Sequence, residues 1–325
     1  ITSSINVALS FTNSQLNTNQ LNTNHSITSI NNIHFIAELI SKSEKPLIIA
    51  GQGALSAGYL INHLVDVYQI PITTTLHAIG IYDESKPLSL KMHGMHGTIY
   101  ANKAIQNSDC IIAIGNRFDD RTIGNLDSYA PFAMQAFKER RGGIIHCNID
   151  PNVFHKTIEQ SYFFQLESKK FVRELLMYMK LNNRDKWLKK ISYWKEMYPI
   201  RYQAMKNNKL TTQHVLKYVD HYIHHCYLYK DVYFTTGVGN HQMMTCQLLT
   251  HRFPNRVLMS GGFGVMGVGL PYAIGLQLSH PNKIIIDLDG DSSFNMTSHE
   301  LKTISQYNLP IKIIIFNDQS QSMVR

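Results

Sequence analysis

Two carboxylates, Asp291 and Asp318, are the residues best placed to do chemistry in this chain. Asp291 follows the apolar run 284–286 after a short polar turn, and Asp318 follows a second apolar run, 313–316; residues 298–307 between them have helical spacing. Parallel strands joined by such a helix are neighbours, so we expect the two carboxylates side by side at the carboxyl edge of a sheet. Hard oxygen ligands beside a helix N-terminus suit Mg²⁺ that carries a diphosphate.

The spacing of these acids resembles a motif of the thiamine diphosphate (ThDP) enzymes, in which Gly-Asp-Gly is followed at a similar distance by Asn-Asn. Here the two halves read Gly290-Asp291-Ser292 and Asn317-Asp318, so Ser replaces a Gly and Asp replaces an Asn. Gly290 allows a tight turn and a close approach of the backbone to a ligand. Short motifs also match by chance, and from the spacing alone a buried strand pair with polar turns explains the pattern equally well.

Composition and charge narrow the class of protein. The chain has 325 residues, of which 44% are apolar, which is enough for two domains with real cores. Its formal net charge is +8, but the Lys and Arg residues are scattered without a basic stripe, so we expect anionic cofactors and no nucleic acid. No apolar run has the length of a membrane span, so no membrane partner is expected. The four cysteines are far apart and are interpreted as small core residues.

The elements that must position these residues alternate between strand and helix. Strands are expected at 46–50, 70–75, 110–115, 143–149, 162–166, 232–236, 256–260, 284–286 and 313–316. Helices are expected at 33–43, 56–68, 101–108, 169–180, 212–223, 270–278 and 298–307, and one ending near 249. This alternation predicts an α/β protein with two doubly wound parallel-sheet domains, which bind ligands at the carboxyl ends of their strands.

The same pattern divides the chain into four parts. Residues 1–32 are rich in Ser, Thr, Asn and Gln and are expected to be a low-complexity linker. Residues 33–182 form the first domain, 183–210 a charged helical connector, and 211–325 the second domain. In the connector, Trp187 and Trp194 stand seven residues apart and are expected to pack against a domain.

Glycine-bearing turns follow three strands of the second domain, at 237–242, 261–269 and 290–292. Glycines at such positions clear space for a diphosphate and a ring system. His241 and Met266 lie beside these turns. Taken alone, a histidine or methionine at such a place is more often part of the core than of a binding site. In a cofactor cradle these two residues become candidates for binding.

Nine stretches together resemble the large, catalytic subunit of acetohydroxyacid synthase (acetolactate synthase), with the fungal form most similar. They read AGQG, TTTL, HGMHG, GNRFDDR, RGGIIH, TTGVGNHQM, SGGFGVMGVGLPYAIG, DLDGDSSFNM and FNDQSQSMV. The resemblance runs from about residue 34 to the end of the sequence. GMHG together with RFDDR separates this family from most other ThDP enzymes.

The resemblance implies a central FAD-binding-type domain followed by part of a diphosphate-binding domain. It also implies that this segment lacks the N-terminal domain whose glutamate contacts the pyrimidine, so no catalytic residue is expected in it and it should not make acetolactate alone. The family reaction decarboxylates pyruvate and joins the product to a second 2-keto acid, pyruvate or 2-oxobutyrate, as the first common step of branched-chain amino-acid biosynthesis. The implied cofactors are ThDP, Mg²⁺ and FAD.

The resemblance also assigns residues by motif position. The metal ligands are Asp291 and Asp318. The ThDP contacts are Val238, Gly239, Asn240, His241, Met266, Gly290, Ser292, Ser293 and Met323. The FAD contacts are Gly51, Gln52, Gly53, Thr75, Leu76, Met95, His96, Gly115, Arg117, Asp119 and Arg121.

Relatives of this family further imply small 2-keto acid substrates, a homodimer or higher oligomer, a regulatory subunit as partner, and a mitochondrial location. The chain departs from the family pattern at four further positions near the cofactors: Asn240 replaces Gln, Met244 replaces Trp, Ser322 replaces Gly, and Asn148 replaces a carboxylate. Two alternatives therefore stay open, an inactive paralogue that binds nucleotide cofactors or partner subunits only, and another ThDP-dependent decarboxylase or oxidase.

Overall fold

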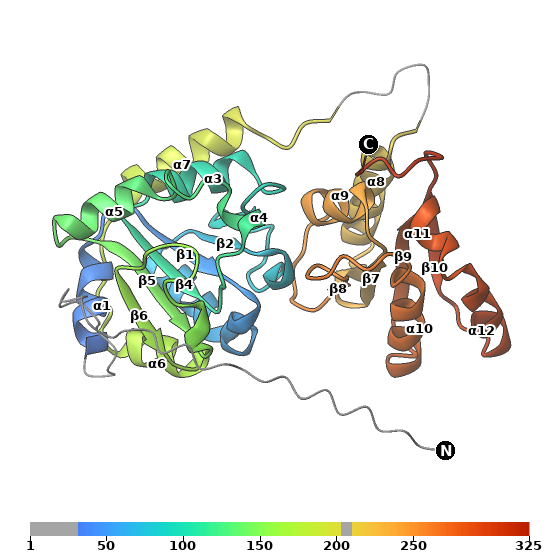
Figure 1. The fold of residues 1–325 in the computed structure, drawn as a ribbon, viewed down its shortest axis with the longest axis horizontal. Helices are drawn as coiled ribbons and strands as arrows, with labels where there is room; N and C mark the ends of the chain where they lie inside the picture. The colour runs from blue at the N-terminus through green and yellow to red at the C-terminus, as the bar shows by residue number, and fades with distance from the viewer. Residues whose placement is uncertain (1–31, 203–209, 325) are drawn as a thin grey trace, which may run out of the picture.

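The computed structural model describes residues 32–202 and 210–324, which form two α/β units, each built on a parallel sheet (Figure 1). The linker expected at 1–32 lies outside the described residues except for Asn32. The fold class predicted from the alternation of strands and helices is therefore confirmed. Among the described helices, none is both long and apolar enough to cross a membrane.

The first unit is a six-stranded sheet in the order β3-β2-β1-β4-β5-β6. Its strands are β1 (Pro46–Ala50), β2 (Ile72–Thr74), β3 (Ser89–Met92), β4 (Cys110–Ile114), β5 (Gly143–Asn148) and β6 (Tyr162–Gln165). Its helices are α1 (Ile33–Lys42), α2 (Gly58–Tyr68), α3 (Ile99–Asn107), α4 (Asp120–Ile123), α5 (Pro131–Lys138), α6 (Ser168–Tyr178) and α7 (Asp185–Met197). The central strands β1 and β4 are buried along their whole length, as expected of parallel strands covered by helices on both faces.

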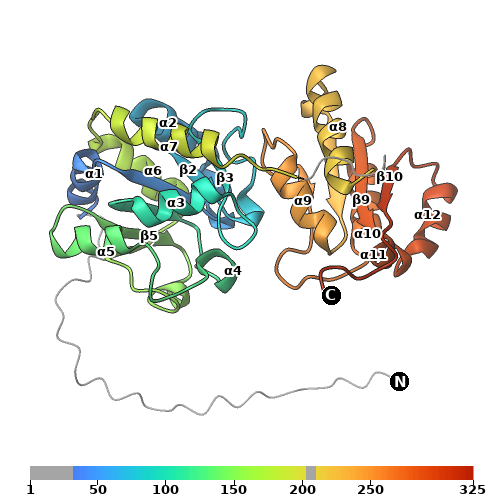
Figure 2. The same cartoon turned by 90° about the horizontal axis from the view of Figure 1, so that it is seen from above.

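Two separate apolar clusters cover the two faces of this sheet. One joins residues of α1, α2 and α6 to the strands, and the other joins residues of α3, α5 and α7. Helix α7, expected as a connector, packs into the second cluster through Trp187 and Trp194 and lies along this unit in both views (Figures 1 and 2). The indole of Trp187 also donates to Pro46 O at 3.0 Å, so α7 is fixed to the first unit rather than free between the two.

The second unit is a four-stranded sheet in the order β10-β9-β7-β8. Its strands are β7 (Val232–Thr236), β8 (Val257–Leu258), β9 (Ile284–Gly290) and β10 (Lys312–Phe316). Its helices are α8 (Thr212–His225), α9 (Asn240–Leu248), α10 (Gly269–Ser279), α11 (Asp291–Asn295) and α12 (Leu301–Gln306). Residues of α8 and α9 pack on one face of the sheet and residues of α10 on the other.

Three local expectations were wrong. Helix α11 begins at Asp291 itself, so the first helical turn after β9 starts seven residues earlier than expected, and the expected helix 298–307 is a 3₁₀ turn, Ser298–Glu300, followed by the shorter α12. Strand β3 was not foreseen. Cys226 is exposed, whereas the other three cysteines are buried as expected.

A buried polar junction joins the two units beside α9, the helix that lies on the side of the second sheet facing the first unit (Figures 1 and 2). Glu84 exchanges two hydrogen bonds with the backbone of His251, one from its own N–H (3.0 Å) and one to its carboxylate (3.1 Å). The Lys91 ammonium lies 3.5 Å from this carboxylate and donates to Gln247 O and Leu249 O at the end of α9. A cation is favourable there because the C-terminal carbonyls of a helix carry partial negative charge.

Replacing Lys91 with Met should lower the free energy of unfolding by about 3 kcal/mol, because the Glu84 carboxylate would stay buried without its cation. The two side chains are 15% and 1% exposed. The free energies are to be measured by urea unfolding followed by circular dichroism. Lys42→Met is the matched control, since the Lys42 side chain pairs with Glu38 on the surface and is 72% exposed. That change should cost less than about 0.5 kcal/mol, and equal losses in the two variants would contradict the junction's role.

Candidate functional site

Two cavities lie at the carboxyl ends of the strands. The first, about 760 Å³, lies between the two units, and the second, about 560 Å³, lies in the second unit. Val238 and Met323 line both, so the cavities are neighbours.

The residues assigned from the sequence divide between the cavities, except that Val238 and Met323 line both. The first cavity is lined by all assigned FAD contacts except Met95, namely Gly51, Gln52, Gly53, Thr75, Leu76, His96, Gly115, Arg117, Asp119 and Arg121. The second is lined by every assigned ThDP and metal residue, namely Val238, Gly239, Asn240, His241, Met266, Gly290, Asp291, Ser292, Ser293, Asp318 and Met323. Met95 lies outside both linings, with a side chain that is 66% exposed.

The wall of the first cavity at the ends of β1 and β4 consists of backbone in close contact. A methyl group on Gly51 would lie 2.2 Å from Gly115 O, and one on Gly115, whose φ is 60°, would lie 2.3 Å from the carbonyl carbon of Gly53. Only glycine fits such an approach without displacing the chain. The AGQG and GNR motifs are therefore two sides of one contact, and together they leave backbone groups at the cavity surface.

The GMHG and RFDDR motifs are also in direct backbone contact with each other. The backbone N–H of Met95 donates to Arg121 O at 2.8 Å, and a methyl group on Gly94, whose φ is 92°, would lie 2.4 Å from the same oxygen. The Asp119 carboxylate accepts hydrogen bonds from the N–H groups of Arg121 and Thr122 and so caps α4. Asp119 and Met95 thus shape the loop that carries the arginines.

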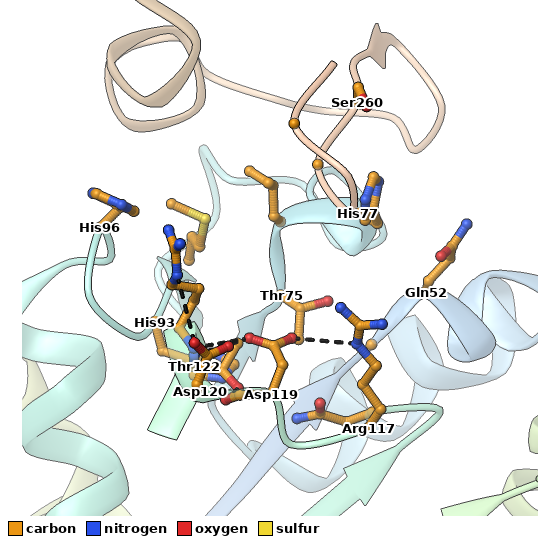
Figure 3. Close-up of a pocket in the computed structure, with 18 of the residues that line it drawn as sticks. Gln52, Thr75, His77, His93, His96, Arg117, Asp119, Asp120, Thr122 and Ser260 are labelled. Atoms are coloured by element: carbon orange, nitrogen blue, oxygen red, sulfur yellow. Dashed lines mark hydrogen bonds and ion pairs between the residues drawn. The ribbon is translucent and has the colours of Figure 1, made fainter. Parts of the chain in front are cut away.

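Arg117 and Arg121 supply positive charge to the first cavity. Each guanidinium lies 3.6–3.7 Å from an aspartate, Asp119 and Asp120 respectively, and both arginine side chains are largely exposed. Such exposed pairs are weak, so either guanidinium can turn to a phosphate, whose oxygens fit its paired N–H donors. The Arg117–Asp119 pair is drawn in Figure 3.

His77 lines this cavity, and neither it nor its contact with the loop after β8 was foreseen in the sequence. His77 is half-buried, and burial, with the charge of Arg117 as a smaller cause, holds its pKa below the ordinary value. A methyl group on Gly261 would lie 2.7 Å from His77 Nε2, so the loop after β8 closes on the first unit. Figure 3 shows this loop, marked by Ser260, above His77. His77 directly follows the TTTL motif, but only the contact between the two units shows that it lines the cavity.

The metal candidates lie at the ends of adjacent strands. Strands β9 and β10 pair in parallel with Phe316 opposite Gly290, so Asp291 and Asp318 leave the sheet at the same edge and line the same cavity. The Asp318 carboxylate accepts hydrogen bonds from the Ser320 N–H and the Ser322 hydroxyl. Within the described parts of the chain, no three His, Cys, Asp or Glu groups converge on one point. Two carboxylates would leave the remaining Mg²⁺ positions to phosphate oxygens and water, which is how proteins usually hold this ion.

His241 is enclosed between two glycine turns. Methyl groups on Gly239 and Gly290 would lie 3.0 and 2.9 Å from the imidazole. Its Nε2 is 3.4 Å from the Asp289 carboxylate, and Phe316 stacks beside the ring. This packing fixes the imidazole at the cavity wall and leaves the turn Gly239–Asn240 open to a ligand at the N-terminus of α9, where anions bind favourably.

A buried pair of acids on β9 lies directly behind the glycine turns of the second cavity. Asp287 and Asp289 are fully buried on β9; Asp287 accepts from the Thr235 hydroxyl at 2.8 Å and Asp289 from the Gly290 N–H at 2.8 Å. Burial, and then the nearby Asp289 charge, raise the pKa of Asp287 to about 7. Methyl groups on Gly237 and Gly269 would lie 1.9 and 2.7 Å from the carboxylate oxygens, so both glycine turns rest directly on the acids.

Met266 is held in the second cavity by the loop that carries it. The N–H of Gly267 donates to the Ser293 hydroxyl at 2.9 Å, and the Thr297 hydroxyl donates to Gly267 O at 2.8 Å. These bonds tie the glycine loop after β8 to α11. Met266 thus adds an apolar side chain to a cavity whose lining combines glycine backbone, carboxylates and hydroxyls with other apolar side chains, among them Val238 and Phe316.

The sequence of this chain matches two known domain families. A family model described as "Thiamine pyrophosphate enzyme, central domain" matches residues 33–175, and one described as "Thiamine pyrophosphate enzyme, C-terminal TPP binding domain" matches residues 237–325. The first match covers the sheet of the first unit, and the second covers all three glycine-bearing turns and both metal candidates.

Similar proteins are acetolactate synthases. The mitochondrial catalytic subunit of Saccharomyces cerevisiae is 40% identical over 297 residues, which are 90% of this chain and 43% of the yeast protein. The mitochondrial catalytic subunit of Aspergillus candidus is also 40% identical, over 89% of this chain and 42% of its own length, and the large subunit of Porphyra purpurea is 40% identical over 89% and 48%. The chain thus spans less than half the length of these curated relatives. It belongs to the thiamine pyrophosphate enzymes, with a first unit that matches their central domain and a second unit that matches their C-terminal TPP-binding domain.

Proposed function

We propose that this chain is the central and diphosphate-binding part of an acetolactate synthase catalytic subunit. The observation that carries the proposal is the second cavity, where the ends of β7, β9 and β10 and the loop after β8 bring all assigned ThDP and metal residues around one space. The identity of 40% to acetolactate synthases over 90% of the chain supports this activity among those of ThDP enzymes. The substrates would be pyruvate and a second 2-keto acid.

The residues of the second cavity fit a metal-bound diphosphate. Asp291 and Asp318 would hold Mg²⁺, and the backbone around Gly239 and Gly290, where a side chain would strike His241, would admit the diphosphate. Met266 would contribute apolar surface against the rings of the cofactor. Bound ThDP supplies the nucleophilic carbon and the electron sink for decarboxylation, while the chain binds it, orients it and excludes water.

The first cavity would hold FAD as a structural cofactor, since the proposed carboligation has no net redox change. Arg117 and Arg121 would meet its phosphates, and the contact between Gly51 and Gly115 would give it a backbone wall. The similarity to fungal mitochondrial enzymes supports a mitochondrial location, and we propose assembly as a homodimer or higher oligomer.

The full-length gene product should form acetolactate from pyruvate when ThDP, Mg²⁺ and FAD are supplied. Asp291→Ala should abolish this activity and weaken Mg²⁺-dependent ThDP binding at least about tenfold, because one of the two carboxylate ligands is lost. Binding is to be measured by isothermal titration calorimetry with and without Mg²⁺. Decarboxylation of pyruvate without acetolactate formation would contradict the proposed reaction and favour another ThDP enzyme.

Asp318→Asn should retain Mg²⁺-dependent ThDP binding. An amide oxygen is still a hard ligand, and the change removes one negative charge beside the diphosphate, so the affinity for ThDP should stay equal or rise. The same calorimetry applies, with Asp231→Asn as a control for removal of a surface carboxylate distant from the cavity. Loss of metal-dependent binding in Asp318→Asn alone would show that the carboxylate has another role.

Arg117→Ala should weaken FAD binding about tenfold, since a charge-assisted hydrogen bond contributes about 1.5–3 kcal/mol. The dissociation constant is to be measured by quenching of flavin fluorescence. Arg173→Ala, on the exposed face of α6, is the matched control and should leave the affinity unchanged. If the folded protein takes up no flavin under any condition, the proposed role of the first cavity is wrong.

A further inference from the structure

Thr297 lies next to the second cavity without lining it. The residue stands between α11 and the 3₁₀ turn Ser298–Glu300, and it is not among the residues that the sequence assigned to a cofactor or metal. Its backbone is held on both sides, because its N–H donates to Phe294 O at 3.1 Å and its carbonyl accepts from the Glu300 N–H at 2.9 Å. The Thr297 side chain therefore extends from a backbone whose position is fixed.

Gly267, the residue after Met266, is held at both of its backbone polar groups. Its N–H donates to the Ser293 hydroxyl at 2.9 Å, and its carbonyl accepts from the Thr297 hydroxyl at 2.8 Å. Both bonds come from one short stretch, residues 293–297. Gly267 cannot rotate away from this stretch without breaking at least one of them, so the two hydroxyls together fix the chain directly after Met266.

Close packing adds a steric constraint at Gly267. Its φ is 84°, a conformation that favours glycine. A methyl group there would lie 3.0 Å from Met296 Cβ and 3.1 Å from Thr297 Cγ2, which is closer than an ordinary contact between carbon atoms. The backbone of the loop therefore lies directly against residues 296–297, with space for little more than hydrogen.

The part of the loop before Met266 is held by a different residue. The N–H of Gly264 donates to Ser260 O at 3.1 Å, and the N–H of Val265 donates to the Ser260 hydroxyl at 3.1 Å. Met266 thus stands between two hydrogen-bonded segments of one loop. The second of these segments is bonded to α11 and Thr297, so the position of Met266 in the cavity depends on them.

We propose that Thr297 is a positioning residue for ThDP binding and that it acts through Gly267 on Met266. This inference rests on the proposed binding of ThDP in the second cavity. Thr297 does not donate to the ligand itself, because its one hydroxyl proton is used on the Gly267 carbonyl and the residue lies outside the lining. It holds the Met266 side chain in place before ThDP arrives, so that less ordering remains to be done on binding.

Thr297→Val should raise the dissociation constant for ThDP about fivefold in the full-length gene product, because valine keeps the branched shape but loses the hydrogen bond. Thr297→Ser keeps the hydroxyl and should bind ThDP within about twofold of the unchanged protein. Isothermal titration calorimetry in the presence of Mg²⁺ measures both affinities. Equal affinities in Thr297→Val and the unchanged protein would overturn the proposal.

A double-mutant cycle tests whether Met266 transmits the effect. In a Met266→Ala background, Thr297→Val should change the affinity for ThDP less than about twofold, because the side chain that Thr297 positions is no longer present. If the fivefold loss persists in that background, Thr297 acts independently of Met266 and the proposal is wrong.

Amide hydrogen exchange of the ligand-free protein tests the constraint without any cofactor. Thr297→Val should speed the exchange of peptides covering residues 261–267 about fivefold, since one hydrogen bond that restrains the loop is lost, and Thr297→Ser should not. Mass spectrometry of the peptides gives the rates. Unchanged exchange in Thr297→Val would show that Thr297 does not hold the loop.

Thr98→Val is the matched control for a general loss of stability. The Thr98 hydroxyl also donates to a backbone carbonyl, Leu90 O at 2.9 Å, but it lies in the first unit and outside both cavity linings. This variant should lower the temperature of thermal unfolding at least as much as Thr297→Val while leaving the affinity for ThDP unchanged. An equal loss of affinity in both variants would overturn the positioning role.

Failure of the unchanged protein to bind ThDP would overturn the proposed function and this inference together. That outcome is seen without any variant, so it is distinct from a failure of the positioning role alone.

Discussion

The position of α9 is the constraint on which both cavities depend. Its C-terminal carbonyls accept hydrogen bonds from Lys91 of the first unit, and the Gln247 side chain near that end donates to His96 O at 2.7 Å. Its N-terminus carries Asn240 and His241 to the second cavity. One short helix is thus fixed to the first unit at one end and borders the second cavity at the other, so the junction between the units sets the geometry of both cavities.

The second cavity also requires close packing of the glycine turns against Asp287 and Asp289. Buried carboxylates usually need partners, yet Asp287 and Asp289 lie under glycine turns with only part of their oxygens hydrogen-bonded within the described chain. The turns must be glycine because any side chain at Gly237 would enter the space of Asp289. Burial under these turns, and then the charge of Asp289, raises the pKa of Asp287. A proton on Asp287 relieves the repulsion between the two acids.

The sequence predicted the strands well where an apolar run leads directly into a turn of polar residues or glycine. The expected apolar runs match β1, β4, β7 and β10 to within one residue at each end. Strand β9 begins where expected but continues four residues beyond the expected run, to Gly290, and the adjacency of β9 and β10 followed from their connection. The junction could not be foreseen, because Glu84 and Lys91 look like surface residues and nothing local indicates that they are buried against another unit. His77 was missed for a similar reason, because only the packing of the loop after β8 against the first unit brings that loop and His77 together in the cavity lining.

The sharing of Val238 and Met323 between the cavities has an evolutionary consequence. A substitution at either position alters two binding surfaces at once, so selection cannot adjust one without testing the other. Drift at these two positions should then be slower than at residues that belong to one cavity. Residues lining a single cavity, such as Asn148 or Asp318, can vary with the needs of one ligand alone.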